Sequence, residues 1–423
     1  MDPSVQVEDL KWTPVHTLLF IAFSIGTTVE AYIYSLSYIA TSWVAMPRTL
    51  LGLLAVWPPL WLLLGGAVSG PLADWIGRKK TLFITLGIYV IGAIGLIFSF
   101  TYITILIFVG LLLFAAGGEY NTILTATHEL FPRRHRSRAL FLELNFTNIG
   151  GSIAAILALL AISSIFDQRV LLGVTLLISI LIMYIIRLRL PESVMWLEAR
   201  GHINQAGDEL KKYSGVYTEG VDNIKPQKLP SIYFRIFIGG VIGWAYTAGF
   251  SLIVLTLGPY FFPSLTDWLI FVFGLVAFFA GFLGLAADRF SRKRFLLISS
   301  VLVVIFAYLF IPTLKLWLTN IVLFWFLFIG VSVFINIYFL AEDTLKSEIW
   351  ATRRRGLYSA IVRVISLGGS IPVIFLAVNL PIISYMWLGI GIFSTGMAAS
   401  VAWYVFGIET SKGKSVRIWD EAK

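Results

Sequence analysis

The chain of 423 residues contains no cysteine, and few of its side chains are charged. The absence of cysteine excludes disulfides and thiol chemistry. Charged residues make up 13% of the sequence and hydrophobic residues 58%, which leaves too little polar surface to coat a soluble globule of this length. The first twelve residues contain Asp2, Glu8 and Asp9 without a basic n-region, so we expect no cleaved signal peptide.

Motifs for catalysis and for ATP hydrolysis are also missing. The nearest approach to a phosphate-binding loop, Gly407 to Ser415, has one residue too many between its glycines. The histidines lie at scattered positions without metal-ligand spacing, namely His16, His128, His135 and His202. We therefore expect no enzyme, no cofactor and no metal, and the energy for any transport must come from gradients.

Long apolar runs occupy most of the chain instead. Each is long enough to cross a bilayer as a helix, and no period-two alternation is sustained as a β-barrel would need. The predicted fold is an all-α membrane protein with twelve transmembrane helices. They are expected at about 17–40, 50–71, 81–99, 103–127, 140–164, 169–190, 235–258, 267–286, 294–313, 318–343, 357–378 and 384–406.

The basic residues of the loops predict the orientation of the chain across the membrane. With the N-terminus inside, the outer loops hold only Arg48, Arg169 and Lys315, and the inner loops carry most of the other basic residues, as the positive-inside rule requires. We expect a multi-pass protein of the cytoplasmic membrane, monomeric, with both termini inside. The net charge of +9 reflects this topology and is weak evidence for nucleic acid, which we do not expect as a partner.

A similar pattern of small, acidic and basic residues occurs twice, about half a chain apart. Gly70, Asp74, Gly77, Arg78 and Lys79 end one apolar run, and Gly284, Asp288, Ser291, Arg292 and Lys293 end another. Glu129 likewise precedes Arg136 by the same spacing as Glu348 precedes Arg355. The repetition predicts two pseudo-symmetric bundles of six helices. The expected domains are 1–186, a cytoplasmic linker with an interfacial helix at 187–234, a second bundle at 235–406 and a tail at 407–423.

The loop from Gly70 to Lys80 resembles that between the second and third helices of the major facilitator superfamily, and the resemblance extends over the whole chain. Pro191-Glu192-Ser193 and Glu409-Thr410-Ser411 are similar to sequences of its sugar porters, and Gly117-Gly118-Glu119-Tyr120 to its metabolite:proton symporters. Relative to the sugar-porter sequences, Met195 stands where an arginine is usual and Ile408 where a proline is usual. Two further departures matter for the site: Val109 stands where an arginine is often found, and Ile33 where a second acid is often found.

The resemblance implies a gate on the cytoplasmic side. Asp74 and Asp288 would accept hydrogen bonds from neighbouring helix N-termini, which favour anions, and would latch the two bundles together. Arg78 and Arg292 would complete the network, and Glu129 with Arg136 and Glu348 with Arg355 would add bridges that break as this side opens. The gate also includes Gly70, Gly77 and Asp343. The alternative is that these charges only cap helices and follow the topology.

Two carboxylates inside the membrane predict proton coupling. Glu30 falls near the middle of the first span and Glu119 in the inner half of the fourth, where an unpaired charge costs at least about 2.5–3.5 kcal/mol. Each could exchange a proton during transport. The alternative is a hydrogen bond across helices.

Polar and aromatic side chains at helical spacing predict a substrate cavity between the bundles. The candidates are Thr27, Tyr34, Asn145, Asn148, Trp244, Tyr246, Thr247, Asn336, Tyr338 and Arg363. Arg363 needs an anion, for which Asp343 is the first choice, Glu342 the second and a substrate carboxylate the third.

The predicted function is secondary active transport of a small polar metabolite (a sugar, polyol or organic acid) by alternating access, coupled to protons as a symport. The alternatives are proton-driven export of drugs or organic cations, an uncoupled facilitator, and a transporter-like solute sensor.

Overall fold

A computed structural model describes residues 7–40, 43–44, 48–132, 134–160, 164–213, 230–283, 291–350 and 355–410. These ranges are helical and contain no strand. Eleven of their helices are long and apolar enough to cross a membrane. The predicted span 294–313 corresponds to α14 (Arg292–Leu309), which has 18 residues with three cations in its first turn and is not among the eleven. An all-helical membrane protein is thus confirmed.

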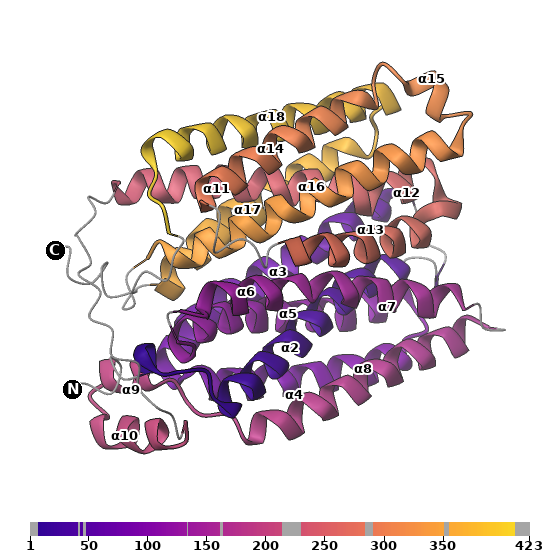
Figure 1. Ribbon diagram of the computed structural model, residues 1–423. Helices are drawn as coiled ribbons and strands as arrows, with labels where there is room; N and C mark the ends of the chain where they lie inside the picture. Colours follow the sequence, from indigo (N-terminus) through magenta and orange to yellow (C-terminus); the bar gives the residue numbers. More distant parts are fainter. Residues whose placement is uncertain are drawn as a thin grey trace.

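We call the helices from α2 to α8 the first half and those from α11 to α18 the second half; Figure 1 shows them as two coloured groups. The first half consists of α2 (Pro14–Ile39), α3 (Arg48–Ile76), α4 (Arg78–Ile97), α5 (Tyr102–Leu130), α6 (Arg136–Asn145), α7 (Thr147–Leu159) and α8 (Ile165–Leu188). The second half consists of α11 (Ile232–Phe250), η2 (Ser251–Thr256), α12 (Leu257–Phe261), η3 (Pro263–Leu265), α13 (Thr266–Gly281), α14, α15 (Leu314–Trp317), α16 (Ile321–Glu348), α17 (Arg355–Ala377) and α18 (Ile382–Phe406).

Between the halves lie two short helices, α9 (Val194–Ala199) and α10 (Ile203–Lys211). The helix α9 forms where the sequence predicts an interfacial helix, and Val194, Met195 and Leu197 are buried. Because residues 214–229 lie outside the described part of the chain, the linker boundaries at 187 and 234 stay a prediction.

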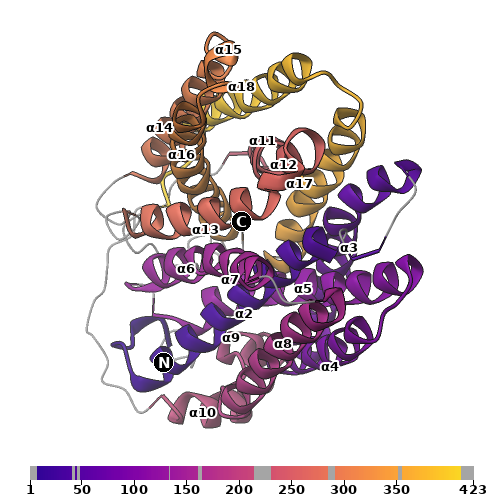
Figure 2. The same cartoon turned by 90° about the vertical axis from the view of Figure 1, so that its right-hand side faces the viewer.

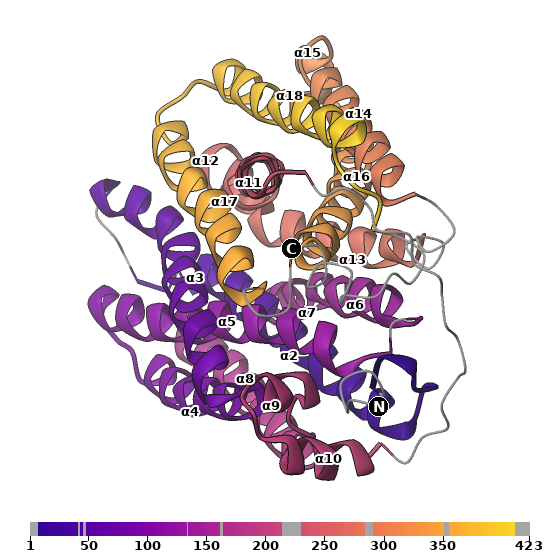
Figure 3. The ribbon, with the colours of Figure 1, turned by 90° about the vertical axis from the view of Figure 1, so that its left-hand side faces the viewer.

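The two halves meet along two seams. Helix α13 packs against α7, and α17 packs against α3, as the end-on view in Figure 2 shows. In Figure 3, the molecule is seen from the end where α9 lies and where α4, α6 and α14 begin. We call this the basic end, because Arg78, Arg136 and Arg292 lie at those helix starts.

Three predicted elements differ in detail. The loop expected from Gly70 to Lys80 is helical except at Gly77, because a φ of +101° at this glycine turns the chain in a single residue. The span expected at 140–164 is split at Phe146 into α6 and α7. The seventh span widens into the π-helix η2, where Thr256 Oγ1 donates to the Ser251 carbonyl at 3.0 Å and Tyr385 OH donates to the Leu252 carbonyl.

Two glycines bring α3 and α5 into backbone contact. A Cβ added at Gly65 would lie 1.9 Å from the Phe114 carbonyl oxygen, and one at Gly117 would lie 2.1 Å from that of Leu62. Both obstacles are backbone atoms, so no side chain can turn aside to make room. Small residues of this kind let membrane helices approach closely.

Alanine at Gly117 should therefore destabilise the protein by about 1–3 kcal/mol, the usual cost of an overpacked core. Thermal unfolding of the detergent-solubilised protein measures the effect. Gly87→Ala on α4 is the matched control, because a Cβ there meets nothing within 4 Å. Equal unfolding midpoints for the two variants would contradict the prediction.

Candidate functional site

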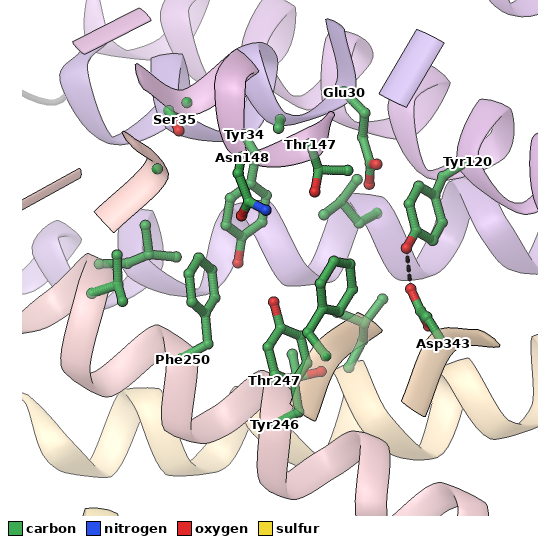
Figure 4. A pocket seen from close by; sticks show the side chains of 18 of the residues that line it. Glu30, Tyr34, Ser35, Tyr120, Thr147, Asn148, Tyr246, Thr247, Phe250 and Asp343 are labelled. Atoms are coloured by element: carbon green, nitrogen blue, oxygen red, sulfur yellow. Dashed lines mark hydrogen bonds between the residues drawn. The ribbon is translucent and has the colours of Figure 1, made fainter. Parts of the chain in front are cut away.

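A cavity of about 150 Å³ lies between the halves. An engineered cavity of that size can hold benzene, so the space suits a solute of about one ring. In Figure 4, Tyr34 and Asn148 of the first half lie opposite Tyr246 and Phe250 of the second half. Six aromatic side chains line the cavity: Tyr34, Tyr120, Tyr246, Phe250, Phe273 and Phe339. Its charged lining residues are Glu30, Glu342, Asp343, Lys346 and Arg363.

An ion pair joins the two halves across this cavity. Arg363 Nη2 on α17 lies 3.4 Å from Glu30 Oε1 on α2. The Arg363 guanidinium also lies over the ring of Tyr120 on α5, 4.2 Å from its centroid. The first-choice pairing of Arg363 with Asp343 is therefore wrong, because the side chain reaches Glu30 instead.

Asp343 has different partners. Lys346 Nζ, one helical turn further along α16, contacts Asp343 Oδ1 and lies 3.4 Å from Glu342 Oε1. Tyr120 OH donates to Asp343 Oδ2, a second link between the halves (Figure 4). Lys346 was not predicted as a site residue, although its spacing of three and four residues from two acids is a usable signal.

Glu119 lies outside the cavity lining. Its Oε1 is 2.5 Å from Arg187 Nη2, its Oε2 is 3.1 Å from Arg187 Nη1, and Thr85 Oγ1 donates to Oε2 at 2.8 Å. Glu119 is 0% exposed and Arg187 1%. Proton coupling by Glu119 stays a prediction, and the ion pair favours the alternative of a bond across helices.

Four of the other predicted cavity residues line the space: Tyr34, Asn148, Tyr246 and Thr247. Five do not, and four of these five form hydrogen bonds to other helices. Thr27 Oγ1 donates to the Glu143 carbonyl at 2.8 Å, Asn145 Nδ2 to that of Phe278 at 2.9 Å, Asn336 Nδ2 to that of Ala277 at 2.7 Å and Tyr338 OH to that of Ile242 at 3.2 Å. The fifth, Trp244, packs on the core of the second half.

At the basic end, Arg78 is the centre of a buried network. Its Nη2 lies 2.7 Å from Glu129 Oε1 and 3.1 Å from Asp74 Oδ1. Ser193 Oγ donates to Glu129 Oε2 at 2.6 Å. All these groups belong to the first half or to α9, so the described contacts of the Asp74 carboxylate do not include a latch between halves.

The predicted bridge between Glu129 and Arg136 is wrong. Arg136 Nη2 instead lies 3.0 Å from Glu8 Oε1, because the N-terminal segment folds back over the start of α6. In the second half, Arg292 Nη2 lies 3.3 Å from Glu348 Oε1. Gly284, Asp288 and the side chain of Arg355 fall outside the described part of the chain, so the gate roles predicted for them, as for Gly70, stay predictions.

Two other glutamates make the contacts with helix N-termini that were expected of Asp74 and Asp288. Glu192 Oε1 accepts from the backbone N–H groups of Arg78 at 2.9 Å and Lys79 at 3.2 Å. Glu409 Oε1 accepts from the Arg292 N–H at 2.8 Å. We call these contacts the two braces. Burial raises the pKa of Glu192, and the backbone donors oppose that rise.

In the described ranges, no three His, Cys, Asp or Glu side chains gather to hold a metal ion. The chemistry that the cavity offers is binding: aromatic faces, hydroxyl and amide groups, and ion pairs that bridge the halves. These are the elements of a site for a small polar solute.

The comparisons with known proteins agree with this architecture. A family model described as "Sugar (and other) transporter" matches residues 20–417. The niacin transporter NiaP of Acinetobacter baylyi is 28% identical over 166 residues, 38% of this chain and 37% of that protein. The glucose transporter GlcP of Staphylococcus epidermidis is 32% identical over 136 residues, 32% of this chain and 30% of that protein. The chain thus spans well under half the length of these two relatives.

Among solved structures, the proton:xylose symporter XylE bound to 6-bromo-6-deoxy-D-glucose has a TM-score of 0.75 at 18% identity, covering 96% of this chain and 98% of that chain. At that identity the likeness shows the fold, which is that of the major facilitator superfamily. The chain therefore belongs to the sugar (and other) transporter family and has the fold of the major facilitator superfamily.

Proposed function

We propose that this transporter moves a small polar metabolite (a sugar, polyol or organic acid) across the cytoplasmic membrane by alternating access, together with a proton carried by Glu30. The observation that carries the proposal is the cavity between the halves, where Glu30 of one half faces Arg363 of the other. Rocking of the halves would separate this pair and expose the carboxylate. The loop charges support an orientation with both termini inside.

The lining supports one ring with polar substituents. Aromatic side chains cover C–H surfaces, and Asn148, Thr247 and Ser35 offer hydrogen bonds. Arg363 Nη1 is buried and has no hydrogen-bond partner in the described ranges, so a hydroxyl or carboxylate on the solute would satisfy it. The names of the relatives, a niacin and a glucose transporter, fit either kind of solute.

Counterflow in proteoliposomes tests the proposal against a panel of monosaccharides, polyols, one-ring carboxylic acids and organic cations. We expect exchange of one of the first three classes. If the solute is a carboxylic acid, Arg363→Gln should reduce exchange about tenfold or more, since a hydrogen bond to a charged group contributes about 1.5–3 kcal/mol. Arg363→Lys, which keeps the charge, is the control.

Three outcomes would favour another function. Exchange of organic cations alone would indicate an exporter of lipophilic cations. A rate of exchange that is the same with and without a pH gradient would indicate an uncoupled facilitator. Binding without exchange would indicate a solute sensor.

A further inference from the structure

Glu143 on α6 differs from every other buried acid in the described part of the chain. Six buried carboxylates have a cationic group within 4.0 Å. These pairs are Glu8 with Arg136, Glu30 with Arg363, Glu119 with Arg187, Glu129 with Arg78, and both Glu342 and Asp343 with Lys346. Glu143 is 0% exposed and has no such partner among the described residues.

Within the described part of the chain, the Glu143 carboxyl forms a hydrogen bond with one group, a hydroxyl. Thr127 Oγ1 on α5 donates to Oε2 at 2.6 Å, and Oε1 is buried with no hydrogen-bond partner among the residues that the structure describes. The Glu143 backbone carbonyl accepts from Thr27 Oγ1 of α2. The carboxyl therefore points toward α5 and the backbone of the same residue contacts α2, so Glu143 lies where three helices of the first half meet.

The free-energy costs of burial favour a protonated, uncharged carboxyl at Glu143. An ionised carboxylate there would keep a full charge in a dry site with one hydrogen bond, and the effective penalty for such an ion is several kcal/mol. A protonated carboxyl leaves at most one polar oxygen unpaired, which costs about 1–3 kcal/mol.

Neighbouring charges do not change this balance. Helix α6 packs against α2, α5, α7, α13 and α16. Besides tyrosines, the titratable side chains on these elements are His16 and Glu30 on α2, Glu119, His128 and Glu129 on α5, Asp267 on α13, and Glu342, Asp343, Lys346 and Glu348 on α16. None of them lies within hydrogen-bonding or ion-pair distance of the Glu143 carboxyl.

The other face of α6 touches the second half at the basic end. Leu140, Phe141 and Leu144 pack in one cluster with Leu340 of α16. The adjacent Asn145 bonds to the Phe278 carbonyl of α13. Any separation of the halves at this end must break these contacts and loosen the element that carries Glu143.

We infer that Glu143 is a proton site, protonated while the halves are in contact at the basic end and ionised once they separate there. The state in which the halves touch at the basic end then binds one more proton than the open state, in which they are separated there. Raising the pH therefore shifts the population toward the open state. The alternation of states rests on the proposed function, whereas the protonation of Glu143 does not.

Infrared spectroscopy of the purified full-length protein tests the protonation. We expect a protonated-carboxyl C=O band at neutral pH that loses a component in Glu143→Gln and keeps it in Glu30→Gln. If Glu143→Gln does not fold, Thr127→Val should shift the frequency of that component by removing its hydrogen bond. A spectrum that neither variant changes would overturn the assignment, whether or not any solute is transported.

Distances between spin labels test the link to opening. Because the chain has no cysteine, labels at Asn204→Cys on α10 and Arg294→Cys on α14, both exposed, react alone. In the Glu30→Gln background, which removes the proton assigned to that acid, the ratio of open to closed molecules should rise with pH by up to about tenfold per pH unit, and adding Glu143→Gln should remove this dependence. An unchanged pH response after that addition would refute the link.

Discussion

Replacing Arg187 with methionine should destabilise the protein by about 3–5 kcal/mol, the cost of breaking a buried ion pair from one side. Among the described residues, Glu119 would be left with Thr85 as its hydrogen-bond donor, deep between α5 and α8. We expect a large fall in the midpoint of thermal unfolding and a low yield of folded protein in detergent.

The double variant Glu119→Gln with Arg187→Met should recover most of that loss, because no unpaired charge then remains. Lys211→Met is the matched control. It breaks an ion pair with Asp208 whose side chains are 80% and 73% exposed, and it should leave unfolding unchanged. If Arg187→Met had the same midpoint of thermal unfolding as the wild type, the ion pair between α5 and α8 would not stabilise the fold.

Glu30→Gln should abolish solute accumulation driven by a pH gradient while counterflow continues. With one proton per solute, a gradient of one pH unit supports at most about a tenfold accumulation, since each unit is worth about 1.4 kcal/mol per proton. The variant should equilibrate its solute without concentrating it, because an amide cannot carry the proton.

Uptake into proteoliposomes, with and without an imposed pH gradient, measures this effect. Glu119→Gln serves as the comparison, because its carboxylate is held by Arg187 away from the cavity. Accumulation that persists in Glu30→Gln and disappears in Glu119→Gln would assign the coupling to the other acid.

The sequence predicted the helices well, because apolar runs of bilayer length leave few alternatives. It also identified Glu30 as an interior charge, and the structure places it in the cavity. Charge partners were predicted less well. Arg187 and Glu8 are far from Glu119 and Arg136 along the chain, and the paired helices meet only in the folded protein.

Polar stripes gave mixed results for a similar reason. A polar residue at helical spacing must avoid lipid, but a neighbouring backbone carbonyl satisfies it as well as a solute does. Asn145, Asn336 and Tyr338 donate to backbone carbonyls of neighbouring helices. Asn148 donates to the Asn336 side chain and also borders the cavity. Periodicity cannot separate these two uses.

The two braces have a consequence for how the protein is held together. Glu192 follows α8 and binds the start of α4, and Glu409 follows α18 and binds the start of α14. Each half therefore carries its own link between two helices that are not consecutive along the chain.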